Sequence, residues 1–567
     1  MKRSQLIGWA SGGFFGGRAE ARIVRTPVPV VYLDVNSTYP LVNALLGTWG
    51  YLRADKLRNA QVTRRVRQLL AAPDLLDRCL EPATWHEIGV TLVELEPGGD
   101  TLPVRAPYDP AGADPGIGVN PLHYEGTLWY MLPDVIAATL LGNSPPRVVR
   151  AIRVVPEGVQ TGLRSVRLRG ERRIDPARED PFIAMVEERR RLQGSPDGDT
   201  EASRWQQRFL KVTANSTAYG SLARFDRVSL GHEADIMVFG PDQPFTWRAE
   251  VAEDPGPYCE PPVAASITAG ARLLLAMLER LVTDAGGVFA ATDTDSMMIV
   301  AIPSGGEVSC ETAEGSTVRA LSFETVRAIA GRFRSLLPFD PALVTDVWKA
   351  EHDSLDEPLW AYVISAKRYC LFRYDDAGDP VLVDRSEHGL GLYLDPTDPE
   401  RPRLDENGER VWISEAWAFL LRGALGIDTP EPAWLDTLAL TRFTISSPTL
   451  WRWFAGYDAA HPEAPIRPGS FGLLAHTDHG PLAPTDRRIP LPAAPYESDP
   501  RTWKGLGWFD AGTGKQLRIT TASPRGDPAR FAEDLAAGCT PVRTLRSVLE
   551  AFVARPEHKS LAPDGAP

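Results

Sequence analysis

The chain has 567 residues, 43% of them hydrophobic and 24% charged, which is typical of a globular protein with two to four structural units. Its formal net charge of −13 argues against a surface that is basic throughout, although a local basic cleft can coexist with an acidic exterior. The sequence has no run of eighteen uncharged apolar residues and no signal-peptide pattern, so we expect no membrane contact. The five cysteines form no Cys-x-x-Cys pair, which argues against a structural zinc site and predicts a reducing, cytoplasmic location.

The first predicted elements lie within the first forty residues. Residues 11–20 are rich in glycine and predict either a loop that approaches another backbone closely or a flexible linker. Residues 28–33 predict a buried strand that leads directly into Asp34-Val-Asn-Ser-Thr-Tyr-Pro40. A carboxylate at a strand end, followed by small hydroxyl residues, suits a site where backbone N–H groups meet an anion, although a lone Asp there is more often a cap or turn residue.

Residues 41–180 mix both kinds of element. The sequence predicts helices over 62–70 and 132–142 and strands over 88–96 and 102–106.

A pair of antiparallel helices is predicted next, over residues 182–193 and 202–216. On the second helix, Gln207, Lys211 and Asn215 recur at every fourth position and form one polar stripe. Such a stripe is usually a solvated face. This one runs toward Ala218-Tyr-Gly220, which favours a functional face.

The segment Ala291-Thr-Asp-Thr-Asp-Ser296 separates two apolar strands and predicts a tight hairpin with Asp293 and Asp295 at its tip. Residues two apart on a strand share a face, so these carboxylates would repel each other unless a cation lay between them. Mg2+ binds carboxylate oxygens together with substrate phosphates. Taken alone, the pattern predicts a simple polar turn about as well.

The remaining elements follow in two stretches. Before the hairpin, residues 229–261 predict strands and turns. A long apolar helix begins at residue 261 and leads into the hairpin. After the hairpin, residues 361–372 predict one strand, interrupted by Lys367-Arg-Tyr369. Beyond about residue 386 the chain is rich in loops, with helices near 413–425, 447–456 and 542–554.

Three separated elements carry the groups that phosphoryl transfer requires. They are Asp34, the carboxylates of the hairpin, and the basic helix pair with Arg189 and Lys211. Two metal ions held by carboxylates clamp the attacking and leaving oxygens of an in-line phosphoryl transfer, and basic side chains neutralise a triphosphate. The nearest lookalike of a phosphate-binding P-loop, Gly512-Thr-Gly-Lys515, lacks the required spacing.

At these positions the chain resembles the family B DNA polymerases. Residues 34–40 resemble motif A of the family, Asp-x-x-Ser-Leu-Tyr-Pro, with Thr38 in place of Leu. Residues 211–220 resemble motif B, Lys-x-x-x-Asn-Ser-x-Tyr-Gly, 292–296 resemble motif C, Tyr-x-Asp-Thr-Asp-Ser, and 367–369 resemble the Lys-x-Tyr motif. Phe15-Gly-Gly-Arg18 also resembles the Tyr-x-Gly-Gly loop of the protein-primed branch. The four motifs occur in the order of the family, which makes the set far more specific than each motif alone.

The resemblance implies an α+β fold shaped as a right hand, with a palm, short two-helix fingers and a thumb, and without an exonuclease domain. The implied division is a glycine-rich lead-in loop with the first palm strand (1–33), the N-terminal palm (34–180), the fingers (181–220), the C-terminal palm (221–385), and a thumb with a C-terminal extension (386–567). The strand-rich stretch 229–261 would be the insertion that confers strand displacement in the protein-primed branch. Only 33 residues precede motif A, so we expect a polymerase that lacks proofreading, a split gene or a truncated start.

The resemblance also implies roles for individual residues. Asp34 and Asp295 would be the principal metal ligands, together with the carbonyl of Val35, and Asp293 would be an accessory catalytic residue. Contacts to the incoming nucleotide are implied for Ser37, Thr38, Tyr39 as steric gate, Arg189, Lys211, Asn215 and Tyr219. Contacts to the primer are implied for Lys367, Arg368 and Tyr369.

Three departures from the family pattern affect these roles. Motif B has one residue more than usual, so either Tyr219 is displaced or a local bulge restores its position. Ala291 stands where Tyr is usual in motif C, and Gln193 stands where the first finger helix often has Lys, so one phosphate contact would be missing.

The leading hypothesis is therefore a DNA-templated DNA polymerase with two Mg2+ ions, for which Mn2+ could substitute. Its partners would be primer-template DNA, dNTPs and either a separate exonuclease subunit or a terminal protein, in a prokaryote, phage or mobile element. The alternatives are a polymerase-derived DNA-binding or replication accessory protein, and a metal-dependent nuclease. A nuclease would explain the carboxylates but not Lys211, Tyr219 or Lys367.

Overall fold

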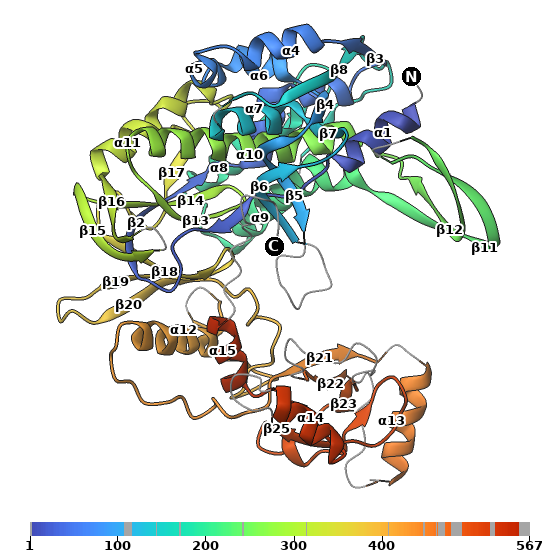
Figure 1. Ribbon diagram of the computed structural model, residues 1–567, viewed down its shortest axis with the longest axis vertical. Helices are drawn as coiled ribbons and strands as arrows, with labels where there is room; N and C mark the ends of the chain where they lie inside the picture. The colour runs from blue at the N-terminus through green and yellow to red at the C-terminus, as the bar shows by residue number, and fades with distance from the viewer. Residues whose placement is uncertain are drawn as a thin grey trace.

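The computed structural model of the protein describes residues 3–106, 116–142, 144–168, 172–240, 243–312, 315–405, 408–445, 448–460, 462, 471–477, 490–521 and 528–554. Figure 1 shows one large body made by the elements up to β20 and a group of C-terminal elements, from α12 onward, beside it.

In the described part of the chain, ten strands form the central sheet. Its main path runs through β1 (Ala19–Ala21), β13 (Phe289–Asp293), β14 (Ser296–Ile302), β2 (Val28–Val35), β18 (Leu359–Ser365), β19 (Arg368–Tyr374) and β20 (Pro380–Arg385). The other members are β15 (Ser304–Thr312), β16 (Gly315–Ser322) and β17 (Trp348–Ala350), which pairs with β2. The central strands β2 and β14 are buried along most of their length, as expected from their continuous apolar sequences.

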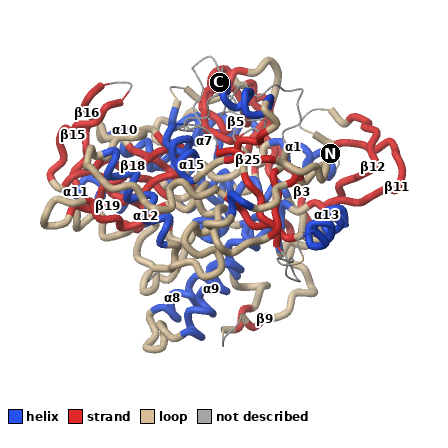
Figure 2. The backbone as a smooth tube through the Cα atoms, turned by 90° about the horizontal axis from the view of Figure 1, so that it is seen from below, coloured by secondary structure: helices blue, strands red, loops and turns tan. Residues whose placement is uncertain are grey.

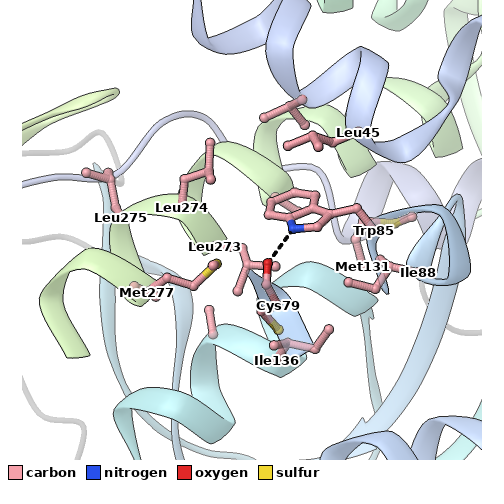
Figure 3. Close-up of a cluster of buried hydrophobic side chains, with 14 of the residues drawn as sticks. Leu45, Cys79, Trp85, Ile88, Met131, Ile136, Leu273, Leu274, Leu275 and Met277 are labelled. Carbon is pink, nitrogen blue, oxygen red and sulfur yellow. Dashed lines mark hydrogen bonds between the residues drawn. The ribbon is translucent and has the colours of Figure 1, made fainter. Parts of the chain in front are cut away.

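The long helix α10 (Pro261–Asp284) is the centre of the hydrophobic core. By length and hydropathy it could span a membrane, but its apolar part is completely buried in the protein, which is the position of a core helix. Around it pack α2 (Thr38–Leu46), α5 (Leu75–Cys79), α6 (Pro82–Ile88) and α7 (Leu132–Leu141). Figure 3 shows Trp85 in this cluster, where its indole N–H donates to the carbonyl oxygen of Cys79 at 2.8 Å.

A second, four-stranded sheet lies beside this core, in the order β3 (Lys56–Gln61), β8 (Arg147–Glu157), β4 (Thr91–Glu96) and β7 (Leu128–Met131). Neighbouring elements are α1 (Arg3–Gly12), α3 (Thr48–Leu52), α4 (Thr63–Leu70) and the hairpin β5 (Gly98–Ala106) and β6 (Gly116–His123). The short antiparallel pair β9 (Val166–Arg167) and β10 (Arg173–Ile174) comes before the helix pair in the chain. Helix α11 (Phe323–Gly331) and the 3-10 turn Arg332–Leu336 follow β16.

The predicted helix pair is present as α8 (Pro181–Gln193) and α9 (Glu201–Asn215), which project together from the body in Figure 2. Each begins at a side-chain cap: Asp180 accepts from the amide of Phe182, and Thr200 accepts from the amide of Ser203. Pro181 at the first helical position suits the fixed φ of that site. A π-helical turn, Ser216–Gly220, and a 3-10 turn, Ser221–Ala223, follow α9.

The predicted strand-rich stretch forms one long exposed hairpin, β11 (Phe225–Val238) and β12 (Phe245–Pro255), which extends away from the body in Figures 1 and 2. It begins four residues earlier than predicted and ends before α10. Residues 241–242 of the predicted stretch lie outside the described residues.

The C-terminal elements contribute to two hydrophobic clusters. One is shared with residues of β18 and β19, such as Ile364 and Phe372, and the other is formed by C-terminal residues alone. They comprise α12 (Val411–Ala424), α13 (Pro448–Ala460), α14 (Pro528–Ala536), α15 (Leu545–Ala554), the sheet β21 (Leu440–Thr444), β22 (Phe471–Ala475), β23 (Pro492–Pro495) and β24 (Phe509–Asp510), the pair β25 (Arg518–Thr521) and β26 (Cys539–Val542), and the 3-10 turn Trp503–Gly505. Three of these helices match the predictions. Helix α14 was not predicted from the sequence.

The prediction of one strand over residues 361–372 is wrong. The chain turns at Ala366 and Lys367, and β18 and β19 pair antiparallel with Ser365 opposite Arg368. The charged segment that was expected to interrupt a strand therefore begins at a hairpin turn, where polar side chains reach solvent without interrupting a ladder.

Candidate active site

Three aspartates meet at one edge of the central sheet because of the register of its strands. Asp34 lies near the end of β2, directly opposite Ser296 of β14. The β13–β14 turn places Asp293 opposite Ser296, and Asp295 follows Thr294, which has the left-handed φ of 62°. The amide of Val35 donates to the carbonyl oxygen of Asp295 at 3.0 Å, so the end of β2 is tied directly to the turn. The sequence prediction that these residues converge is correct.

Asp34 and Asp295 share a poorly solvated position. Burial raises the pKa of the Asp34 carboxyl to about 8, helped by the charges of Asp295 and Glu351 and opposed by Lys211 and Lys349. Burial also raises the pKa of Asp295, against a hydrogen bond of 2.9 Å from the Thr38 hydroxyl. Two carboxylates that resist ionisation together are favoured in their charged form by a cation between them.

Asp293 has different surroundings although it belongs to the same turn. Its Oδ1 forms an ion pair of 2.8 Å with Nζ of Lys367 and accepts a hydrogen bond of 2.9 Å from the Thr294 hydroxyl. Its charge is therefore already compensated within the protein. The accessory role of Asp293 stays a prediction.

The donor set at this edge suits a hard divalent cation. In the described ranges, no group of three or more His, Cys, Asp or Glu side chains forms a complete metal cage. The carboxylates of Asp34 and Asp295, with the carbonyl of Val35 beside them, instead offer a partial oxygen set. Mg2+ is commonly bound in this way, with water and substrate phosphates completing its shell.

A cleft of about 520 Å³ opens above these carboxylates, between the strand ends and the helix pair. Nine of the predicted site residues line it: Asp34, Val35, Ser37, Thr38, Tyr39, Arg189, Lys211, Asn215 and Asp295. Five further lining residues with polar side chains were not assigned from the sequence: Asn36, Arg190, Gln193, Lys349 and Glu351. Asp293, Tyr219, Lys367, Arg368 and Tyr369 lie outside this lining.

The basic wall of the cleft comes from α8 and α9. Arg190 donates to Oδ1 of Asn36 at 2.6 Å and to Oε1 of Gln193 at 3.1 Å, which fixes its guanidinium beside the strand end. Burial and the charge of Arg190 lower the pKa of Arg189. Two adjacent guanidinium groups in a cleft favour an anion, because each disfavours the charge of the other. Arg189 was assigned to this site from the sequence, but its neighbour Arg190 was not. The sequence does not show which of the adjacent basic side chains on the helix face the cleft.

The extra residue of motif B is accommodated by the π-helical turn Ser216–Gly220. A π-turn widens one helical turn by a residue and so restores the register of the residues after it. The ring of Tyr219 lies 4.5 Å from that of Tyr39, centroid to centroid. Of the two alternatives left open by the sequence, the local bulge is the one present, and Tyr219 keeps its contact with Tyr39 at the cleft.

Ser37 and Thr38 lie at the start of α2, where the first amides of the helix have no partner within it. Ser37 has left-handed φ and ψ, 57° and 56°, and makes no side-chain cap. Burial raises the pKa of Tyr39, which follows them. The start of a helix with free amides is a favourable position for an anion.

The Lys-x-Tyr segment lies beside the cleft, on the β18–β19 turn. The hydroxyl of Tyr369 is 3.4 Å from that of Tyr32, which points to the same face of β2 as Asp34. Arg368 instead lies over the ring of Phe552 in α15, at 4.7 Å, and so faces the C-terminal elements. The structure thus brings Lys367 and Tyr369 toward the carboxylates, but not Arg368.

Comparison with known proteins gives matches among solved structures. Phi29 DNA polymerase, complexed with primer-template DNA and incoming nucleotides, matches at 12% identity with a TM-score of 0.32, over 67% of this chain and 53% of that one. The family B DNA polymerase of the hyperthermophilic archaeon Pyrobaculum calidifontis matches at 16% identity with a TM-score of 0.28, over 86% of this chain and 45% of that one. The chain spans about half the length of these proteins. No protein-family model and no curated protein matches the sequence. Both of these solved structures are DNA polymerases.

Proposed function

We propose that the protein is a DNA-templated DNA polymerase that adds dNTPs to the 3′ end of a primer. The observation that carries the proposal is the composition of the 520 Å³ cleft. Its floor holds two carboxylates of raised pKa, and its wall holds Arg189, Arg190 and Lys211. An acidic floor facing a basic wall fits a nucleoside triphosphate together with divalent cations.

The carboxylates of Asp34 and Asp295 and the carbonyl of Val35 would hold the cations. When bound, two Mg2+ ions, or Mn2+ in their place, supply the charge that clamps the attacking and leaving oxygens of phosphoryl transfer. Lys211, Arg189 and Arg190 would hold the outer phosphates, and the free amides at Ser37 and Thr38 would bind the same group from the strand end.

The remaining residues would select and hold the substrates. Tyr39, braced by Tyr219, would pack under the sugar and exclude a 2′-hydroxyl, and Asn215 would line the pocket of the nascent base pair. Lys367 and Tyr369, with Arg368 further out, would hold the primer terminus. In this proposal the central sheet is the palm, α8 and α9 are the fingers, the elements after residue 386 form the thumb, and the β11–β12 hairpin serves strand separation.

The accessory-protein hypothesis took the extra residue of motif B as a sign of decay. The π-turn removes that argument, because Tyr219 remains in contact with Tyr39. A metal-dependent nuclease would use the carboxylates and the basic wall, but it gives no role to the contact between Tyr39 and Tyr219.

The deciding experiment is extension of a labelled primer on a DNA template with dNTPs and Mg2+, for the wild type and Asp295→Ala. Extension by the wild type that is lost in the variant supports the proposal, and the same assay with NTPs tests Tyr39 as a gate. A wild type that binds primer-template but never extends it, with Mg2+ or Mn2+, would contradict the proposal and favour the accessory role.

A further inference from the structure

The glycine-rich loop predicted over residues 11–20 is shorter in the structure, because α1 runs to Gly12 and β1 begins at Ala19. The loop that remains, residues 13–18, is held from one side by α10. Arg272 of that helix is 2% exposed and pairs with Asp134 of α7, with N–O distances of 2.7 and 2.8 Å. The same guanidinium donates to the carbonyl oxygen of Phe15 at 2.8 Å and to that of Gly16. A buried ion pair that also satisfies two loop carbonyls fixes the backbone of the loop against the core.

The end of the loop is held two helical turns further along the same helix. Arg18 is 4% exposed and pairs with Glu20 at 2.6 Å and with Glu279 at 2.5 Å. Arg22 completes the group by pairing with Glu279 at 2.5 Å. Two cations and two anions compensate one another there, so the network is neutral and rigid.

On its other side, the loop touches the catalytic turn itself. The amide of Thr294 donates to the carbonyl oxygen of Arg18 at 2.7 Å, and Ala19 is the direct β-partner of Asp293. A Cβ at position 17 would lie 2.8 Å from Cγ2, 2.9 Å from Oγ1 and 3.1 Å from Cα of Thr294. Gly17 is therefore in close contact with the one residue that separates the two aspartates.

Thr294 adopts a conformation that needs such support. Its φ of 62° is costly for a β-branched residue and persists only where the surroundings impose it. Its hydroxyl also donates to Asp293. A shift of Thr294 would consequently move both carboxylates of the turn.

We infer that the glycine-rich loop is a buttress that sets the position of the Asp293-Thr-Asp295 turn, with Gly17 and the carbonyl of Arg18 as its positioning groups. The inference rests on the proposed polymerase function for its kinetic consequences only. The loop links the buried Arg18–Glu279 and Arg272–Asp134 pairs to the metal-binding edge of the sheet, so the catalytic geometry depends on the core helix α10.

The test uses two neighbouring glycines with different surroundings. Gly17→Ala introduces the contact with Thr294, whereas Gly16→Ala places its Cβ where no atom lies within 4 Å. We expect kcat for nucleotide addition to fall about 10- to 100-fold in Gly17→Ala, since a displacement near 1 Å can cost that much, with KM for dNTP within about threefold of the wild type. Gly16→Ala should match the wild type in both constants.

Rescue separates positioning from general damage. In Gly17→Ala/Thr294→Gly the side-chain collision is gone, and the residue at 294 adopts positive φ without cost. We therefore expect kcat of this double variant to be about tenfold higher than that of Gly17→Ala. A purely structural defect caused by Gly17→Ala would not be relieved by a second change in the turn.

Hydrogen exchange of the amide at residue 294 provides a readout that needs no activity. We expect faster exchange in Gly17→Ala than in the wild type, and unchanged exchange in Gly16→Ala, because only the first disturbs the bond to Arg18. Equal exchange and equal kcat in the two alanine variants would overturn the inference, as would a failure of Thr294→Gly to restore any activity to Gly17→Ala. If the wild type itself proved inactive, the proposed function would fail, and the exchange comparison would still decide on the buttress.

Discussion

The two sides of the β13–β14 turn carry the same side chain in opposite environments. Asp293 is paired with Lys367 and held by the Thr294 hydroxyl, so its charge is balanced by the chain itself. Asp295 lies near Asp34, and both have raised pKa values although Thr38 donates a hydrogen bond to Asp295. Charge is therefore left poorly compensated on the side of the turn that opens into the cleft. This is the side where a bound cation would have an effect.

The largest effect is expected for Asp295→Asn. The change keeps the size of the side chain but removes a charged ligand, so nucleotide addition should fall by on the order of 10³-fold or more. Single-turnover primer extension at saturating Mg2+ measures this loss. Retention of more than a tenth of the activity would mean that Asp295 does not hold a cation.

A smaller effect is expected on the other side of the turn, for Asp293→Asn and Lys367→Met. Each should lower the rate about tenfold, because each leaves one member of a half-exposed ion pair alone beside the proposed position of the primer terminus. The double variant should lose little more than either single one, since the two residues act as one unit. Fully additive losses in the rate would show that Lys367 acts independently of Asp293.

The contrast between the two aspartates also marks the limit of what the sequence can predict. The convergence of Asp34, Asp293 and Asp295 could be predicted, because each aspartate is adjacent to an apolar strand and lies in a motif that resembles a metal-binding motif of the family B DNA polymerases. The compensation of Asp293 could not, because Lys367 follows 74 residues later and was assigned to the middle of a strand instead of a turn.

Two further residues that line the cleft, Lys349 and Glu351, were not predicted as site residues, for a related reason. Lys349 and Glu351 lie on and just after the short strand β17, which pairs with β2 so that Lys349 is opposite Asp34. A three-residue strand carries too little periodicity to be recognised before its partner is known. The helix pair, by contrast, was predicted to within two residues because capping and spacing are local properties.

Replacing a carboxylate on the poorly compensated side of the turn should raise the stability of the protein although it lowers its activity. A carboxyl whose pKa is raised by folding, from 3.8 to about 8 for Asp34, keeps its proton in the folded protein where the unfolded chain has lost it. The unfolded state then binds fewer protons, so the metal-free protein loses stability as pH rises between these two values. Asp34→Asn should remove this loss and raise the Tm at pH 8 by roughly 1 °C for each kcal/mol of relieved desolvation and repulsion, because the entropy of unfolding grows with chain length, while lowering activity.

Thermal unfolding in EDTA at pH 5 and pH 8 measures this effect, and Asp293→Asn is the matched control. Because Asp293 is ion-paired, its replacement should leave the Tm at pH 8 unchanged or slightly lower. A rise in Tm for both variants would contradict the difference between the two sides of the turn.

The smallest effect is expected for Thr38→Val, which removes the hydroxyl that donates to Asp295 while keeping the shape of the side chain. That hydrogen bond favours the ionised carboxylate and opposes the rise in its pKa. Its loss should raise the pKa of Asp295 further, so the acidic limb of the pH–rate profile should move to higher pH, with a rate loss of only a few-fold at pH 9. A profile that falls uniformly at all pH values would instead show that Thr38 acts on the triphosphate through its position at the start of α2 and leaves the ionisation of Asp295 unaffected.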